Sequence, residues 1–196
     1  FNGETDFNQD ISSWDMSNVI FTIRMFKGAT SFNQDIGNWD LSNATNIGEM
    51  FKGATSFNQD IGDWDVSNVT NMAETFKGAT SFNNDSSNSI NNWNTSNVTT
   101  MEFMFGKGGN FSVATAMDFN QDIGDWNVGK VQNFRAMFRN SLFNQDLSDW
   151  DVSSATTLRQ MFDQTKQFNN GGVSLNCWDT SSATDMDWMF YLTLIN

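Results

Sequence analysis

The sequence predicts an α/β repeat solenoid in which about seven copies of a 25-residue unit stack on one another. Three recurrences predict it. The motif Phe-Asn-Gln-Asp, or a Phe-Asn-Asn variant, begins at Phe7, Phe32, Phe57, Phe82, Phe119, Phe143 and Phe168. A tryptophan follows each one, at Trp14, Trp39, Trp64, Trp93, Trp126, Trp150 and Trp178. A second phenylalanine comes 12 residues after each tryptophan, at Phe26, Phe51, Phe76, Phe105, Phe138, Phe162 and Phe190.

Insertions fall outside the stretch from the tryptophan to the second phenylalanine. They lie at 86–92, 106–118 and 171–176. Surface turns accept extra residues more easily than packed segments do, so the tryptophan-to-phenylalanine stretch is predicted to be the rigid part of each coil.

The segment from Ile61 to Asn68 has apolar residues at its first, fourth and sixth places. This spacing is close to the leucine-rich-repeat pattern, and the alternation from Trp64 to Val66 predicts a short strand. The following residues, 69–78, carry apolar side chains with a helical spacing. They predict a short helix or 3₁₀ turn, with Thr70 as its N-cap and Gly78 as its terminator.

Each coil is therefore predicted to place a short parallel strand on one face and a helical or 3₁₀ turn on the other. We expect one array over residues 1–196, with repeats near 7–31, 32–56, 57–81, 82–118, 119–142, 143–167 and 168–196. The stretch from Phe1 to Phe7 aligns with that from Phe26 to Phe32, so the chain is expected to be a segment of a longer one.

The composition argues against several classes of partner. The formal net charge is -13, which disfavours nucleic acid and anionic membrane surfaces. No apolar run reaches the roughly 18 residues that span a bilayer, so no membrane insertion is expected in this segment. The single cysteine, Cys177, allows no internal disulfide, and the chain has no histidine.

One column of polar residues, each directly after a tryptophan, is the candidate ligand or cation face. Its members are Asp15, Asp40, Asp65, Asn94, Asn127, Asp151 and Asp179. Stacked carboxylates repel one another by on the order of 1 kcal/mol per pair. Three interpretations stay open: the side chains cap turns, they bind Ca²⁺ through oxygen ligands, or they contact a polar partner such as a protein or a glycan. No metal site is firmly predicted, and Ca²⁺ is the one cofactor considered.

A second column is interpreted as a structural ladder in which each side chain bonds the backbone of a neighbouring coil. Its members are Asn8, Asn33, Asn58, Asn83, Asn120 and Asn144. Two asparagines that begin Asn-x-Ser/Thr motifs in insertions, Asn84 and Asn110, are the candidate glycosylation sites.

The acidic residues recur in nearly every coil, so no coil stands out as an active site. Paired carboxylates can hydrolyse glycosidic bonds, but that chemistry needs one defined pair of acids. No catalytic residue is predicted, and the sequence indicates a protein that is not an enzyme.

The copies at 39–61 and 64–82 read Trp-Asp-x-Ser-Asn-x-Thr, followed by Phe-Lys-Gly-Ala-Thr-Ser-Phe-Asn. This unit resembles the BspA-like leucine-rich-repeat surface proteins, and more narrowly the 25-residue repeat of mycoplasma-type lipoproteins. The resemblance implies an extracellular or cell-surface adhesive module whose partner is a protein or glycan. The alternative is a structural spacer or a fibre element that associates with further copies of itself.

Overall fold

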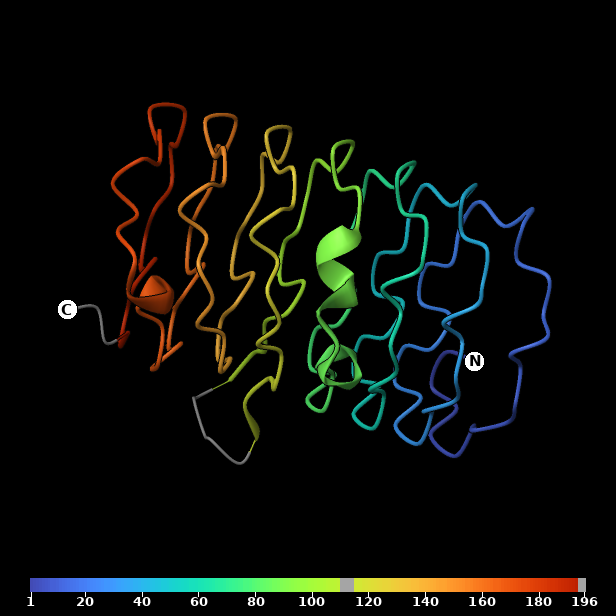
Figure 1. The fold of residues 1–196 in the computed structure, drawn as a ribbon. Coiled ribbons are helices and arrows are strands. Elements are labelled where there is room, and N and C mark those ends of the chain that lie inside the picture. The colour runs from blue at the N-terminus through green and yellow to red at the C-terminus, as the bar shows by residue number, and fades with distance from the viewer. Residues whose placement is uncertain (110–114, 194–196) are drawn as a thin grey trace.

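The structure is a computed structural model that describes residues 1–109 and 115–193. The chain winds through successive coils that lie side by side, with the N-terminus and the C-terminus at opposite ends of the stack (Figure 1). Each unit that contains one of the seven recurring tryptophans forms one coil, and we number the coils from the first, which contains Trp14. The fold is thus a repeat fold, as the sequence predicts.

The predicted strands and helices are not present in the described residues. The helical segments there are three short 3₁₀ pieces: η1 (Asn84–Ser86), η2 (Asn88–Asn92) and η4 (Asn170–Gly172). Residues 64–66 form no strand, and residues 69–78 form no helix. The prediction that Thr70 caps a helix is wrong as well, because the Thr70 hydroxyl donates to the Thr45 carbonyl of the preceding coil.

An alternating pattern of backbone hydrogen bonds takes the place of the predicted helix. In the third coil, amides at every second residue donate to carbonyls of the fourth coil: Met72 to Thr100, Glu74 to Glu102, Phe76 to Met104 and Gly78 to Gly106. The amides between them donate three residues back within their own coil: Thr75 to Met72, Lys77 to Glu74 and Ala79 to Phe76. Half of the donors therefore join coils, whereas a helix would use all of them locally.

The parallel backbone pairing lies in this same stretch and not at the tryptophans. Isolated parallel bridges link one residue of each coil to the next, through Phe21, Asn46, Asn71, Thr100, Asn133, Thr157 and Asp185. Three residues later the backbone takes a left-handed conformation, with φ between 51° and 61°, at Arg24, Glu49, Glu74, Phe103, Ala136, Gln160 and Trp188. Helical φ is negative, so this residue stops a helix and turns the chain.

Aromatic columns fill the interior of the stack. Phe51 stacks on Phe26 and on Phe76, with ring centroids 5.4 and 5.6 Å apart, and on Phe57, the first residue of the next repeat, at 4.0 Å. Trp64 is buried, and its indole nitrogen donates to the Ile36 carbonyl of the preceding coil at 2.9 Å. The tryptophans after the first therefore combine packing in the stack with an indole hydrogen bond to the coil before.

The insertion that contains η1 and η2 lies across the middle of the stack in the view of Figure 1. Its serine, Ser89, packs directly over Gly62, where a Cβ atom would come within 2.0 Å of the Ser89 hydroxyl oxygen. Glycine is therefore required at residue 62 for this insertion to pack against the third coil. No helix in the described part of the chain has the length and apolar character to cross a membrane.

Candidate functional site

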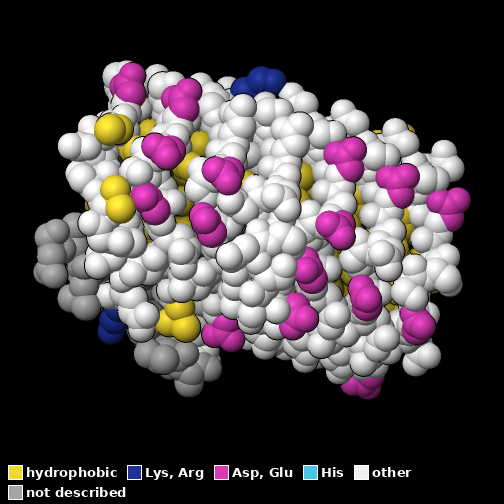
Figure 2. Space-filling model, viewed as in Figure 1, with side chains coloured by type: hydrophobic (Ala, Val, Ile, Leu, Met, Phe, Trp, Pro, Cys, Tyr) yellow, Lys and Arg dark blue, Asp and Glu magenta, His cyan; other side chains and the backbone are white. Residues whose placement is uncertain are grey.

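Acidic side chains spread over one side of the stack in two groups, with an uncharged strip between them (Figure 2). We use the name acidic face for the column of seven candidate residues that the sequence analysis identified, each directly after a tryptophan. All seven are solvent-exposed. The first six coils have a second aspartate three residues after the motif phenylalanine, and the seventh has Gly171 there. These aspartates are exposed too: Asp10, Asp35, Asp60, Asp85, Asp122 and Asp146.

Each member of the acidic face caps a tight turn through its side-chain oxygen. The Asp15 Oδ1 atom accepts the backbone N–H of Ser17 at 3.0 Å and its hydroxyl at 2.6 Å. The same bond two residues ahead is made by Asp40, Asp65, Asn94, Asn127, Asp151 and Asp179. The two asparagines make this bond without a charge, so the cap needs an oxygen and not a carboxylate.

These bonds also favour the ionised form of Asp15, Asp40, Asp151 and Asp179. The Ser17 hydroxyl and N–H hold the pKa of Asp15 below its ordinary value, and Ser42 does the same for the pKa of Asp40. The neighbouring Asp15 carboxylate acts in the opposite direction on Asp40. The pKa values of Asp151 and Asp179 are lowered by their serines in the same way. The column therefore carries negative charge at neutral pH.

The acidic face has no converging ligand set for a cation. Among the residues that the structure describes, no group of three or more Asp, Glu, His or Cys side chains is placed to hold a metal ion. Ca²⁺ takes six to eight oxygen ligands, whereas these carboxylates are spread one to a coil along the stack. Of the three interpretations, turn capping is the one that hydrogen bonds support directly.

The ladder asparagines lie in line and bond the backbone of the next coil. The Asn8 Oδ1 atom accepts the N–H of Asn33 at 2.9 Å, and Asn33 accepts that of Asn58 at 2.8 Å. The same bond continues from Asn58 to Asn83, Asn83 to Asn120, Asn120 to Asn144 and Asn144 to Asn169. The column runs unbroken past the insertion that contains η1.

The structure argues against glycosylation of Asn84. Its side chain is fully buried: Oδ1 accepts the Ile61 N–H at 2.9 Å, and Nδ2 donates to Asp60 and to the Ser87 carbonyl. A glycan on Nδ2 would require this side chain to leave its site. The motif itself is a local pattern and carries no information about burial. The other candidate, Asn110, lies outside the described residues.

Asn170 repeats the role of Asn84 three coils later. Its Oδ1 atom accepts the Leu147 N–H at 2.8 Å, and its Nδ2 donates to Asp146 and to the Val173 carbonyl. A buried asparagine with the same hydrogen bonds therefore lies at the start of each of these two insertions. The shared Phe-Asn-Asn variant at Phe82 and Phe168 was the signal in the sequence.

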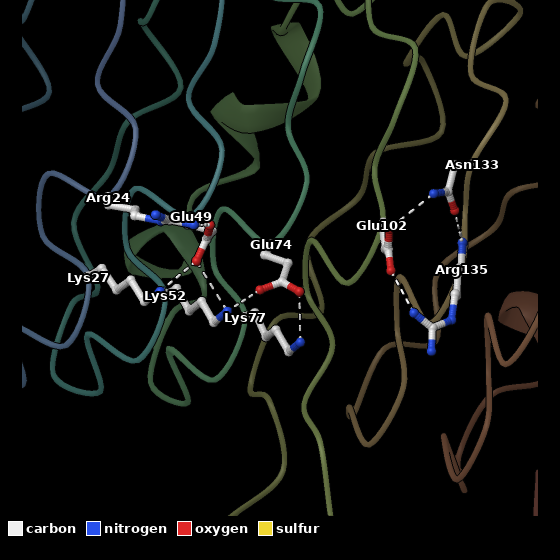
Figure 3. Close-up of polar contacts among 9 residues, drawn as sticks. All are labelled: Arg24, Lys27, Glu49, Lys52, Glu74, Lys77, Glu102, Asn133 and Arg135. Carbon is white, nitrogen blue, oxygen red and sulfur yellow. Dashed lines mark hydrogen bonds and ion pairs between the residues drawn. The ribbon is translucent and has the colours of Figure 1, made fainter.

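The sequence analysis missed a chain of ion pairs on a different side of the coils, shown in Figure 3. We name it the ion-pair belt, and it consists of Arg24, Lys27, Glu49, Lys52, Glu74 and Lys77. Its signal was present in the sequence, because a glutamate and a lysine recur 10 and 13 residues after a tryptophan at Glu49 and Lys52 and again at Glu74 and Lys77.

Each belt glutamate is held by cations from two coils. The Glu49 carboxylate bonds Arg24 and Lys27 of the first coil, with Lys27 Nζ at 2.7 Å, and Lys52 of its own coil at 3.2 Å. These partners, Arg24 above all, lower the pKa of Glu49 to about 2. Glu74 is bonded by Lys52 and Lys77. Apart from Lys77, the belt residues also line a groove of about 470 Å³, together with Asn46 and Asn71.

In the fourth coil an aromatic ring replaces the belt glutamate. Lys77 Nζ lies 3.8 Å from the centroid of the Phe103 ring, and the Arg135 guanidinium lies 5.5 Å from it. Arg135 also bonds Glu102 at 2.8 Å. The belt therefore continues from an ion pair into a cation–π contact without a break.

Comparison with known proteins gives a family without an assigned activity. The family model described as "Mycoplasma protein of unknown function, DUF285" matches residues 1–89 and again residues 86–194. The chain belongs to this family. The two DUF285 matches together span all seven coils, and they agree with the narrower half of the resemblance found in the sequence, the mycoplasma repeat. No curated protein and no solved structure matches the chain.

Proposed function

We propose that this DUF285 chain is a non-catalytic recognition module of the cell surface or extracellular space, which binds a protein or glycan through its acidic face. The resemblance of its repeat to BspA-like leucine-rich-repeat surface proteins supports the location and the adhesive role. The partner offers positive charge or hydrogen-bond donors, because the acidic face offers carboxylate oxygens.

One observation carries this proposal. In every coil, the segment from the ladder asparagine to the residue three places after the tryptophan contains no lysine or arginine. Seven of the ten basic residues form ion pairs with the chain's own acids outside this segment: Arg24, Lys27, Lys52 and Lys77 in the belt, and Arg135, Arg139 and Arg159 in later coils. The carboxylates of the acidic face are therefore left without cations of this segment, and an external partner can neutralise them.

The turn caps leave part of each carboxylate for such a partner. In Asp15, Asp40 and Asp65 the cap uses only Oδ1. The second oxygen takes no part in the turn, so a partner can be bound without unfolding it. Equivalent carboxylates recur from coil to coil, and such a periodic surface suits a partner with its own repeat.

A binding experiment with two charge-matched variants tests the proposal. Wild-type protein is measured on a panel of immobilised basic proteins and glycans beside the variant Asp40→Asn/Asp65→Asn. The variant should retain the turns, since Asn94 and Asn127 cap theirs as asparagines. The control Glu4→Gln/Asp6→Asn removes the same charge from two exposed residues that precede the first coil.

We expect the acidic-face variant to lose binding by about tenfold to the surfaces that wild type binds, and the control to lose less than about threefold. Equal binding by both variants would reject the acidic face as the binding surface. Wild-type protein that binds none of the surfaces would favour the alternative, a structural spacer or fibre element, which a continuous aromatic core along the stack also suits.

A further inference from the structure

The groove beside the ion-pair belt is lined by small residues and carboxamides as well as by charged side chains. It measures about 470 Å³, and its lining includes Asn46, Gly48, Asn71 and Ala73. These four residues belong to the second and third coils, each of which has a neighbouring coil on either side. This part of the groove is therefore a feature of the side of the stack and does not result from an end of the chain.

The two asparagines present unused N–H donors to the groove. Asn46 Oδ1 accepts the N–H of Gly48 at 2.8 Å, and Asn71 Oδ1 accepts that of Ala73 at 2.8 Å. Their Nδ2 atoms donate to no group in the part of the chain that the structure describes. Each partly buried carboxamide is therefore fixed through its oxygen and keeps two N–H donors for a ligand.

The fifth coil shows what such a carboxamide binds within the chain itself (Figure 3). Asn133 takes the place of Asn71, seven residues after the tryptophan, and its Oδ1 accepts the N–H of Arg135 at 2.9 Å. Its Nδ2 donates to one oxygen of Glu102 at 3.1 Å, and Arg135 Nη1 donates to the other oxygen at 2.8 Å. A carboxamide and a cation together thus hold one carboxylate through charge-assisted hydrogen bonds.

The second and third coils have the carboxamide of this arrangement without its carboxylate. Glu102 lies nine residues after its tryptophan. The corresponding residues in the coils before Asn71 and Asn46 are Gly48 and Ile23. Neither side chain can accept a hydrogen bond, so the place of the carboxylate is left to a ligand.

The groove's own carboxylates are already bonded, whereas its cations keep N–H groups to donate. Glu49 is bonded by three cations and Glu74 by two. Arg24 donates Nε and Nη2 to Glu49, so its Nη1 group remains, and its side chain is 54% exposed.

The groove and its immediate partners carry more positive than negative charge. Its three glutamates, Glu102 included, are paired with five cations: Arg24, Lys27, Lys52, Lys77 and Arg135. This leaves a local excess of two positive charges. Salt at physiological ionic strength screens charges beyond about 8 Å, so this excess acts on a bound anion more strongly than the net charge of -13 does.

We propose that the groove binds a uronic acid unit of an acidic glycan. The ligand's carboxylate would bond one of the two carboxamides and a belt cation, as Glu102 bonds Asn133 and Arg135. Its hydroxyl groups would bond the second carboxamide and the oxygens of the lining glutamates, since a hydroxyl both donates and accepts. The side chains of an acidic peptide bring acceptor oxygens without these donors, so a glycan fits the mixed lining better. The site lies away from the acidic face and goes beyond the function proposed above.

Fluorescence anisotropy with the whole 196-residue chain tests the site. The probe is tetragalacturonate labelled at its reducing end. One control probe is its methyl ester, which keeps the rings and removes the charge, and the other is labelled tetraglutamate. Binding is measured for wild type, Asn46→Thr/Asn71→Thr and Arg24→Gln.

The asparagine variant is designed to keep the turns. Thr100 and Thr157 stand in the same place in other coils, and their hydroxyl oxygens accept the N–H two residues ahead, as the asparagine oxygens do. Threonine therefore removes the carboxamide donors without a change of charge. The matched control is Asn18→Thr/Asn38→Thr, which makes the same change at two exposed asparagines outside the groove.

We expect Asn46→Thr/Asn71→Thr to weaken tetragalacturonate binding by about tenfold and Arg24→Gln by about threefold to fivefold, because each removes donors to the ligand. The matched control should stay within about twofold of wild type. The methyl ester and tetraglutamate should each bind the wild type at least about tenfold more weakly than tetragalacturonate does. Circular dichroism melting checks that each variant is folded.

Four results would each overturn the glycan site. They are no binding of tetragalacturonate by wild type, wild-type affinity in folded Asn46→Thr/Asn71→Thr, equal binding of the methyl ester, and equal binding of tetraglutamate, which would favour an acidic peptide. The acidic-face variant Asp40→Asn/Asp65→Asn separates the two proposals. If it loses binding to the surface panel while the asparagine variant binds tetragalacturonate as wild type does, the recognition function stands and the groove site fails.

Discussion

The side-chain oxygen of Asn33 accepts the backbone N–H of Asn58 at 2.8 Å, so a residue in one coil satisfies the backbone of the next. Asn58 does the same for two amides, those of Asn83 at 2.8 Å and of Asp85 at 3.0 Å. Successive coils form no extended strands over residues 1–109 and 115–193, and this asparagine column supplies part of the coil-to-coil pairing that strands would otherwise provide.

Replacement of Asn58 tests the ladder. We expect Asn58→Ala to lower the free energy of unfolding by about 1–3 kcal/mol, because it leaves the partly buried N–H of Asn83 without its acceptor. Urea denaturation measures the change. Asn18→Ala, an exposed asparagine of the first coil, should change the stability by less than about 0.5 kcal/mol. A cost for Asn58→Ala no greater than for Asn18→Ala would contradict a structural ladder.

The tryptophan column makes a prediction that depends on position in the stack. Trp64→Phe removes the indole donor to the Ile36 carbonyl and leaves a smaller ring in a buried site. We expect a loss of about 2–4 kcal/mol in the free energy of unfolding. Trp14 is 45% exposed in the first coil, so Trp14→Phe should cost less than about 1 kcal/mol. Thermal melts of the two variants, measured side by side, compare these two losses of stability.

The belt predicts a loss of stability in acid. The folded pKa of Glu49 is about 2 against an ordinary value of 4.5, so its contribution is fully present above pH 4.5 and is lost as the pH falls toward 2. We expect about 1–2 kcal/mol from this group, since the half-exposed Arg24 is screened by solvent. The pH dependence of unfolding should be shallower over this range in Glu49→Gln. An unchanged slope would show that the ion pairs contribute nothing.

The left-handed turns predict the effect of adding a side chain to Gly78. Its φ is +72°, and a Cβ atom there would meet nothing within 4 Å, so only backbone strain opposes substitution. Gly78→Ala should therefore cost about 1–2 kcal/mol of unfolding free energy, and Gly78→Asn less, because asparagine tolerates this conformation better. Chemical denaturation compares them. Equal costs for the two substitutions would show that the loss of stability comes from steric contact of the new side chain and not from backbone conformation.

Divalent cations should act on the acidic face by screening alone. The carboxylates lie one to a coil, so Ca²⁺ and Mg²⁺ at equal ionic strength should raise the melting temperature by the same amount. Differential scanning calorimetry of chelator-treated protein, with each cation added back, makes the comparison. A rise specific to Ca²⁺ would show a real calcium site and restore that interpretation of the column.

Several features could be predicted from the sequence because they repeat. The inward tryptophan column, the phenylalanine stacks and the asparagine ladder all follow from one spacing that recurs in every coil. The secondary structure could not be predicted in this way. The apolar spacing of residues 69–78 fits a helix, yet Glu74 has a φ of 58° and the amides on either side of it alternate between two coils. This alternation of hydrogen-bond acceptors requires a neighbouring coil. The sequence of a single repeat does not show that coil.

The candidate sites divide along the same line. The acidic column is visible in the sequence, because it needs only the offset from the tryptophan. In the belt, Arg24 pairs with Glu49, which is 25 residues away in the sequence. This pair forms only because the two side chains face one another across neighbouring coils. The burial of Asn84 likewise depends on the Ile61 amide of the coil before it. Local motifs carry neither distance nor burial.

By itself, therefore, the sequence determined that this chain is a repeat protein, which side chains form its interior columns, and that five aspartates and two asparagines form one polar column. Only the tertiary structure decided that the coils pair through alternating turns in place of strands and helices, and which charges are neutralised internally. The reason is physical. Columns follow from periodicity along one chain, whereas hydrogen-bond partners, ion pairs and exposure are properties of neighbouring coils in contact.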